Sequence, residues 1–121
     1  MAGILLVEDD KDLRVMLKKS LERNKFQVIE AENGRDALNK FKLNVVDLVV
    51  TDLLMPEQDG IGLIMELKKI KPGILIIAIS GGGKAGPTSY LTIAETLGAN
   101  AVFPKPFSLN QFLDKVNTLL K

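Results

Sequence analysis

The 121-residue sequence contains no cysteine, no histidine and no tryptophan. Without cysteine the chain has no disulfide framework, no thiol nucleophile and no thiolate ligand for zinc. Without histidine it lacks the side chain that most often serves as a general base or metal ligand near neutral pH. Aromatic residues make up only 5% of the chain, which argues against a flavin stacked on protein rings. Any chemistry must therefore use carboxylates, hydroxyl groups, lysine and the backbone.

An excess of one charge and long apolar runs are also missing. Sixteen basic and fifteen acidic residues give a net charge of +1, so no overall field attracts nucleic acid or a membrane surface. No stretch approaches the ~20 apolar residues of a membrane span, and no basic region precedes the apolar start as it would in a secretion signal. The length, with 46% apolar and 26% charged residues, predicts one globular, cytoplasmic domain over residues 1–121.

Short apolar runs alternate with amphipathic stretches along the chain. The runs are typical of strands buried on both faces, and they are Gly3–Val7, Phe26–Glu30, Val45–Thr51, Ile74–Ser80 and Ala101–Phe103. The stretches between and after them have helical spacing, with buried faces expected at Leu13, Met16, Leu17 and Leu21, at Ala37, Leu38 and Phe41, at Ile61, Ile64 and Met65, at Leu91, Ala94 and Leu97, and at Phe112, Leu113, Val116 and Leu120. Arg14 is expected outside the first face, and Ser108 with Gln111 forms a capping box.

Five strand–helix units of this kind predict an α/β fold with a parallel sheet and helices on both sides. Five strands cannot close an eight-stranded barrel, so the sheet is expected to be open and doubly wound. In such sheets the functional site lies at the carboxyl ends of the strands. The residues that end the strands are therefore the candidates for a site.

Acids, a hydroxyl group and a lysine follow four of the five predicted strands. These are Glu8, Asp9 and Asp10 after the first strand, Asp52 after the third, Ser80 before a run of glycines after the fourth, and Lys105 after the fifth. Each has an ordinary structural interpretation, since an aspartate can cap a helix and a serine can occupy a turn. Their joint occurrence at one edge of the sheet favours a shared site.

The charges at this edge call for a cation. Two carboxylates about 4 Å apart repel by roughly 4 kcal/mol at an effective dielectric constant of about 20. Three converging acids, Glu8, Asp9 and Asp52, therefore need positive charge nearby or a bound proton. Lys105 supplies one charge, and a divalent metal would supply more. An all-oxygen ligand set favours Mg²⁺ over zinc or copper.

At this point the residues resemble a known family. The segments Ile4–Asp10, Thr51–Pro56 with Asp59–Gly60, Ser80 and Lys105–Phe107 are similar to the receiver domain of two-component response regulators, in the family's order and approximate spacing. The resemblance covers nearly the whole chain. It implies a flavodoxin-like (βα)5 fold with strand order 2-1-3-4-5, and a stand-alone receiver that works as a phosphoprotein in phosphorelay signal transduction.

The resemblance also implies roles for the residues at the strand ends. Asp52 would be the phosphoacceptor, with Lys105 and Ser80 contacting phosphoryl oxygens. Magnesium would be held by Glu8, Asp9, Asp52 and the backbone carbonyl of Leu54. Asp10, one place further along, would cap the following helix, and the Lys105–Pro106 peptide bond would be cis.

One departure from the family pattern, and two residues at positions that tune hydrolysis in the family, affect the expected signalling. Val102 stands where the family commonly has Tyr or Phe, and Phe103 is expected to face the other side of its strand as a core residue. The switch that follows the hydroxyl is therefore assigned to the backbone of Gly81–Gly83 and Gly86–Pro87. Leu54 and Gly82 offer no polar side chain to orient water, which predicts slow self-dephosphorylation.

The expected partners are a sensor histidine kinase or a histidine phosphotransfer protein, and an unknown downstream protein, with no direct contact to nucleic acid or membrane. The chain is expected to be a monomer or weak dimer and no enzyme beyond its own phosphorylation and slow dephosphorylation. Its last predicted helix ends at Lys121, which leaves no room for an effector.

Two alternatives stay open: a receiver-like interaction module that is never phosphorylated, and a phosphatase of the haloacid dehalogenase type. That phosphatase family needs an Asp where Leu54 stands.

Overall fold

A computed structural model describes residues 2–54, 60–81 and 87–120. Within them, five strands alternate with five helices. The strands are β1 (Gly3–Val7), β2 (Gln27–Ala31), β3 (Leu48–Asp52), β4 (Leu75–Ser80) and β5 (Ala101–Pro104). The helices are α1 (Lys11–Arg23), α2 (Gly34–Leu43), α3 (Gly60–Ile70), α4 (Pro87–Thr96) and α5 (Leu109–Leu120).

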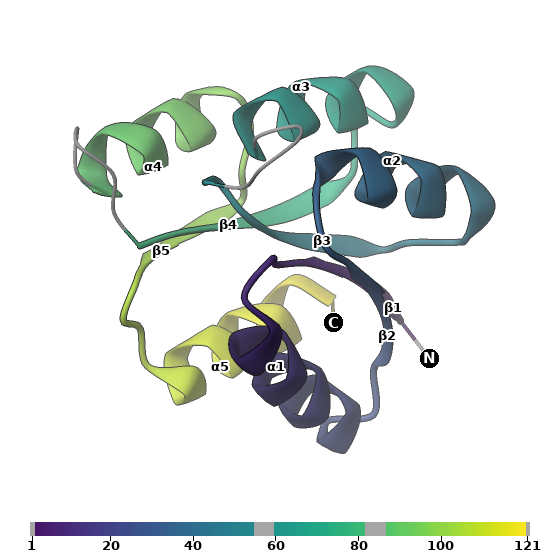
Figure 1. Cartoon of the computed structure of the whole chain (residues 1–121), viewed down its shortest axis with the longest axis vertical. Coiled ribbons are helices and arrows are strands. Elements are labelled where there is room, and N and C mark those ends of the chain that lie inside the picture. Colours follow the sequence, from purple (N-terminus) through teal and green to yellow (C-terminus); the bar gives the residue numbers. More distant parts are fainter. Residues whose placement is uncertain (1, 55–59, 82–86, 121) are drawn as a thin grey trace.

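The strands form one parallel sheet in the order β2-β1-β3-β4-β5, which confirms the predicted topology. Helices α2, α3 and α4 cover one face, and α1 and α5 cover the other (Figure 1). Since consecutive units run in the same direction, the carboxyl ends of all five strands lie at one edge. The chain order changes direction between β1 and β3, the point at which doubly wound sheets place their ligands.

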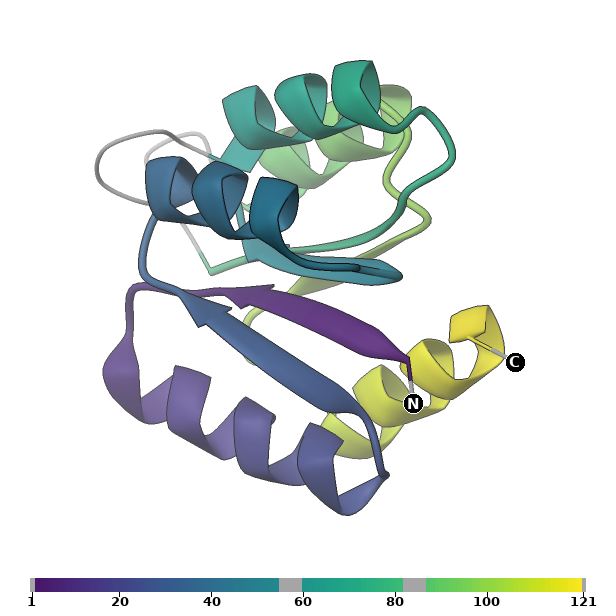
Figure 2. The same cartoon turned by 90° about the vertical axis from the view of Figure 1, so that its right-hand side faces the viewer.

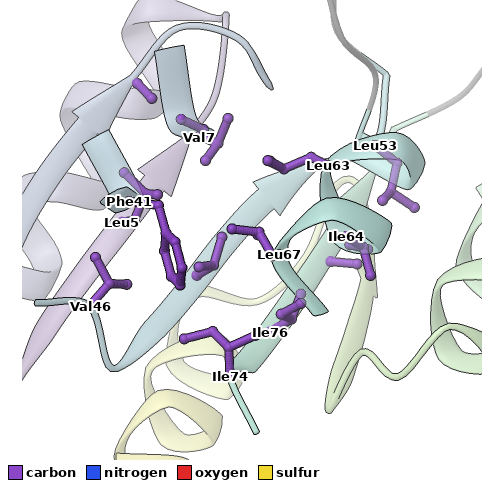
Figure 3. Packing of buried hydrophobic residues seen from close by; sticks show 14 of the residues in the cluster. Leu5, Val7, Phe41, Val46, Leu53, Leu63, Ile64, Leu67, Ile74 and Ile76 are labelled. Atoms are coloured by element: carbon purple, nitrogen blue, oxygen red, sulfur yellow. The ribbon is translucent and has the colours of Figure 1, made fainter. Parts of the chain in front are cut away.

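Two apolar layers hold the helices to the sheet. One lies under α2 and α3 and includes Leu5, Val7 and Phe41, which Figure 3 shows packed together. The other lies under α1 and α5 and includes Ile4 and Leu6. Alternate residues of β1 thus enter opposite layers, so the strand is buried on both faces as predicted.

Two details differ from the expectations, and one agrees with them. The third strand begins at Leu48 rather than Val45 and extends to Asp52, because Val45 belongs to the preceding loop and is 85% exposed. Met16 and Met65 are exposed over 41% and 48% of their surfaces. Both lie at the margin of an apolar stripe, where the sheet no longer covers the helix. The Ser108 cap is present: its Oγ accepts a hydrogen bond from the Gln111 amide at 3.2 Å.

Strand β2 lies at the margin of the sheet, which Figure 2 views from that side. The Ala31 carbonyl of β2 points toward β1, where it accepts a hydrogen bond from the Glu8 amide. Because the carbonyls of successive residues in a strand point to opposite sides, the Glu30 carbonyl points away from the sheet. The ammonium group of Lys40 in α2 donates a hydrogen bond to this outward carbonyl.

Candidate functional site

Carboxylates from two strand ends converge at the edge of the sheet. Glu8 and Asp9 follow β1, and Asp52 is the last residue of the adjacent β3. One carboxylate oxygen from each of the three lies within 4.8 Å of the other two. Glu8 and Asp52 are buried, while Asp9 is exposed. The structure thus brings together the three acids singled out in the sequence.

Lys105 joins this group from the loop after β5. Its Nζ lies 2.8 Å from Asp52 Oδ2 and 3.1 Å from Glu8 Oε1. Its backbone amide donates to the Ser80 carbonyl at 2.8 Å, which ties the loop to the end of β4. The Lys105–Pro106 peptide bond is cis, as expected. One ammonium group therefore bridges two buried carboxylates at the centre of the site.

The ionisation of the site follows from this burial. Burial raises the pKa of Glu8 to about 7; the hydrogen bond from the Asp10 amide opposes this rise, the charge of Asp52 adds to it, and Lys105 opposes it. Burial alone would lower the pKa of Lys105, but the hydrogen bond and charge of Asp52, together with Glu8, outweigh it and raise that pKa. The lysine stays charged, and three carboxyl groups share this single positive charge.

Hydrogen bonds fix the Asp52 carboxylate and its neighbours. Asp52 Oδ1 accepts from the Leu54 amide at 3.1 Å, and the Asp52 carbonyl accepts from Thr51 Oγ1 at 2.8 Å. Ser80 lies at the end of the next strand and is fully buried. Its Oγ has no hydrogen-bond partner among the described residues. A buried hydroxyl group without a partner lowers the stability of the folded protein by about 1–3 kcal/mol. A hydrogen bond to a ligand oxygen would recover this free energy.

Asp10 caps helix α1 rather than joining the acids. Its side chain accepts hydrogen bonds from the Asp12 and Leu13 amides at 3.0 and 3.3 Å, the geometry of an N-cap. This agrees with the role expected for it. Beside it, a groove of about 480 Å³ between α1 and the loop after β5 leads to Lys105. Asp10, Leu13 and Phe107 are among its lining residues.

Arg14 lies outside the apolar face of α1, as its position in the helical pattern predicts, but it does not extend into solvent. Its side chain is 12% exposed, because Nη1 donates to the Glu8 carbonyl at 2.7 Å and Nε pairs with Glu30 at 3.4 Å. Arg14 therefore holds the backbone that carries the first acid of the site. Helical spacing alone could not reveal this contact, since it depends on how the loop of residues 8–10 folds back over the helix.

A comparison with known families gives the site its context. The sequence model described as response regulator receiver domain matches residues 4–117. The chain belongs to the response-regulator receiver family. Receivers are phosphoryl-accepting signalling modules rather than classical enzymes, so the family membership favours neither the phosphatase nor the never-phosphorylated module.

Individual relatives agree with this assignment. The receiver is 39% identical to the chemotaxis protein CheY of Bacillus subtilis, over 97% of this chain and 96% of that protein. It is 38% identical to a segment that makes up 13% of the sensor kinase CckA of Brucella abortus, over 99% of this chain.

Solved structures show the same fold. The non-phosphorylated HemR receiver domain from Leptospira biflexa superposes with a TM-score of 0.88 at 34% identity, covering 100% of this chain and 95% of that one. The response regulator TrrA from Thermotoga maritima, solved in complex with Mg²⁺-BeF, gives 0.87 at 30% identity, covering 98% and 99%. None of the described helices combines the length and apolar character that a membrane crossing requires.

Proposed function

We propose that Asp52 is the residue of this receiver that accepts the phosphoryl group. An Asp52 carboxylate oxygen would attack the phosphorus of a phosphohistidine on a partner protein. The new bond is the O–P bond of an aspartyl phosphate, the bond that breaks is N–P, and the released imidazole takes up a proton. The observation that carries the proposal is the position of Asp52, buried at a strand end between two other acids and 2.8 Å from an ammonium group.

A magnesium ion fits the residues present. The carboxylates of Glu8, Asp9 and Asp52 lie together, and with the backbone carbonyl of Leu54 they would be the donors. All four are hard oxygen ligands of the kind that Mg²⁺ prefers. When bound, Mg²⁺ neutralises negative charge on the carboxylates and on the phosphoryl oxygens. The site supports such an ion because Lys105 alone leaves the three acids with excess negative charge.

Lys105 and Ser80 would receive the phosphoryl group. The ammonium group that now bridges Asp52 and Glu8 can pair with a phosphoryl oxygen, since phosphoryl transfer depends mainly on positioning and charge neutralisation. The Ser80 hydroxyl group, which has no partner among the described residues, would donate to a second oxygen. On phosphorylation of Asp52, Lys105 would thus exchange a carboxylate for a phosphoryl oxygen, and Ser80 would gain a hydrogen bond.

The signal would then reach the surface formed by α4, β5 and α5. Val102 and Phe103 pack in opposite apolar layers, so the only ring in this part of β5 belongs to the core and not to a switch. We assign the movement to the backbone after Ser80, beginning at Gly81. The rest of that segment, residues 82–86, lies outside the described residues, as does Gly82 of the lifetime prediction. Leu54, the other residue of that prediction, offers no polar group to attacking water.

The proposed partners follow from this chemistry. A sensor histidine kinase or a histidine phosphotransfer protein supplies the phosphoryl group, and a downstream protein reads the switched surface. We propose a cytoplasmic monomer or weak dimer that acts by protein contact, without direct binding to nucleic acid. The receiver would catalyse only its own phosphorylation and slow dephosphorylation.

Intact-protein mass spectrometry after incubation with acetyl phosphate tests the proposal. The expected result is a single phosphoryl adduct that requires Mg²⁺ and is missing in Asp52→Asn, which keeps the shape of the side chain. An adduct that persists in Asp52→Asn would assign the chemistry to another residue. Steady release of phosphate without an adduct would point to a phosphatase instead.

A further inference from the structure

The start of helix α3 lies directly against the strand end that carries Asp52. The Gly60 amide donates to the Leu53 carbonyl at 3.1 Å, so the first residue of α3 contacts the residue that follows β3. Gly60 and Leu53 are both buried. The backbone on either side of the Asp52–Leu53 peptide group is therefore packed against the first turn of a helix.

No side chain fits at position 60. A Cβ atom on Gly60 would lie 2.3 Å from the Asp52 carbonyl oxygen and 2.6 Å from the Leu53 Cα. A carbon and a carbonyl oxygen normally approach to about 3.3 Å, so one of the two backbones would have to move by about 1 Å. Both obstructing atoms belong to the main chain, and no side-chain rotation can relieve the clash.

We propose that Gly60 is a positioning residue for Asp52: by having no side chain, it lets α3 hold the Asp52–Leu53 peptide where the carboxylate meets the other acids and Lys105. The inference rests on the proposed function of Asp52. A side chain at position 60 would force the Asp52–Leu53 peptide and α3 apart, and the part of this movement taken up by the strand end would displace the Asp52 carboxylate and the Leu54 carbonyl. A displacement of about 1 Å in a reacting group can reduce a rate about 100-fold.

The direction of the effect distinguishes this role from helix propensity. Replacing glycine with alanine within a helix ordinarily favours the helix, because alanine has the highest intrinsic propensity. Gly60→Ala is expected to do the opposite and to impair the site. Gly73→Ala is the matched control, since nothing lies within 4 Å of a Cβ at that position.

A second control separates positioning from general loss of stability. Val116 is fully buried in the layer under α5, away from the acids, so Val116→Ala destabilises the core without altering the strand end. All variants are compared at a temperature at which circular dichroism shows them folded. Calorimetric titration gives the Mg²⁺ dissociation constant, and mass spectrometry gives the rate of adduct formation from acetyl phosphate.

We expect Gly60→Ala to raise the Mg²⁺ dissociation constant and to lower the adduct rate, each at least ten-fold, while both controls stay within two-fold of the unmodified receiver. Values for Gly60→Ala within two-fold of the unmodified receiver would overturn the inference, as would an equal loss in Val116→Ala. If the unmodified receiver binds Mg²⁺ but forms no adduct, only its self-phosphorylation from acetyl phosphate fails, and the Mg²⁺ affinities of the variants still decide the role of Gly60. A receiver that binds no Mg²⁺ overturns both.

One measurement needs no variant and holds even if Gly60→Ala does not fold. The close approach of Gly60 to the Leu53 Cα predicts a nuclear Overhauser effect between the Hα protons of these two residues in the unmodified receiver. We expect this signal at full intensity with and without Mg²⁺. Its absence would show that α3 does not hold the strand end and would overturn the inference.

Discussion

Glu8 makes the stability of the metal-free receiver depend on pH in an unusual direction. Its pKa is about 7 in the folded chain and 4.5 in the unfolded reference, mainly because the carboxyl group is buried. Between these values the folded state holds a proton that the unfolded state has lost. Stability therefore falls as pH rises through this window, the reverse of the effect of an acid stabilised by a salt bridge.

The difference between the two pKa values gives the size of the effect. At 1.36 kcal/mol per unit, the shift corresponds to about 3 kcal/mol of stability lost between pH 4.5 and pH 7. The full loss is reached above pH 7. Glu8→Gln keeps the size of the side chain and removes its ionisation, so it should remove this contribution. We expect the variant to be about 3 kcal/mol more stable than the unmodified receiver at pH 8, and the gap to close toward pH 4.5.

Urea denaturation followed by circular dichroism, in EDTA from pH 4.5 to pH 8.5, measures this gap directly. Glu66→Gln is the control, because Glu66 is half-exposed and forms only a surface pair with Lys69 at 3.8 Å. Its stability should follow that of the unmodified receiver at every pH. A gap between Glu8→Gln and the unmodified receiver that does not change with pH would refute the reasoning, because burial of Glu8 would then not govern its ionisation.

Three further predictions concern single residues around the site. Arg14→Gln should raise the Mg²⁺ dissociation constant several-fold in calorimetric titration, because the Glu8 carbonyl loses its guanidinium donor; an unchanged constant would show that the loop holds without it. Asp10→Ala should lower the free energy of unfolding by about 1 kcal/mol and leave Mg²⁺ affinity unchanged, whereas a large loss of affinity would make Asp10 a ligand. Leu54→Asn should accelerate decay of the Asp52 phosphoryl adduct in a mass-spectrometric time course, and an equal decay rate would count against Leu54 as a determinant of lifetime.

The parallel sheet and the meeting of the acids could be predicted because both follow from local patterns, whereas the order of the strands came from the family resemblance. Mostly apolar strands of four to six residues are easily distinguished from amphipathic helices, and parallel strands deliver their last residues to one edge. Glu8, Asp52 and Lys105 could therefore be assigned to one site although 97 positions separate Glu8 from Lys105. The family resemblance then assigned a role to each of them.

The contacts that support the site could not be predicted in the same way. Arg14 follows an ordinary helical pattern, and its buried contact with the Glu8 carbonyl depends on the path of the preceding loop. The need for Gly60 depends on how closely α3 approaches β3, a distance that no local pattern encodes. Val45 belongs to an apolar run, yet it lies outside the sheet because β3 begins three residues later.

The hydrogen bond from Lys40 to the outward carbonyl of Glu30 has a consequence for behaviour in concentrated solution. An open strand margin offers main-chain groups to which another polypeptide can attach, which is how many folded proteins begin to aggregate. At β2, an incoming strand would have to displace an ammonium group from the carbonyl it needs and then lie beside that charge. Lys40 thus disfavours the pairing of another strand with the β2 edge of the sheet.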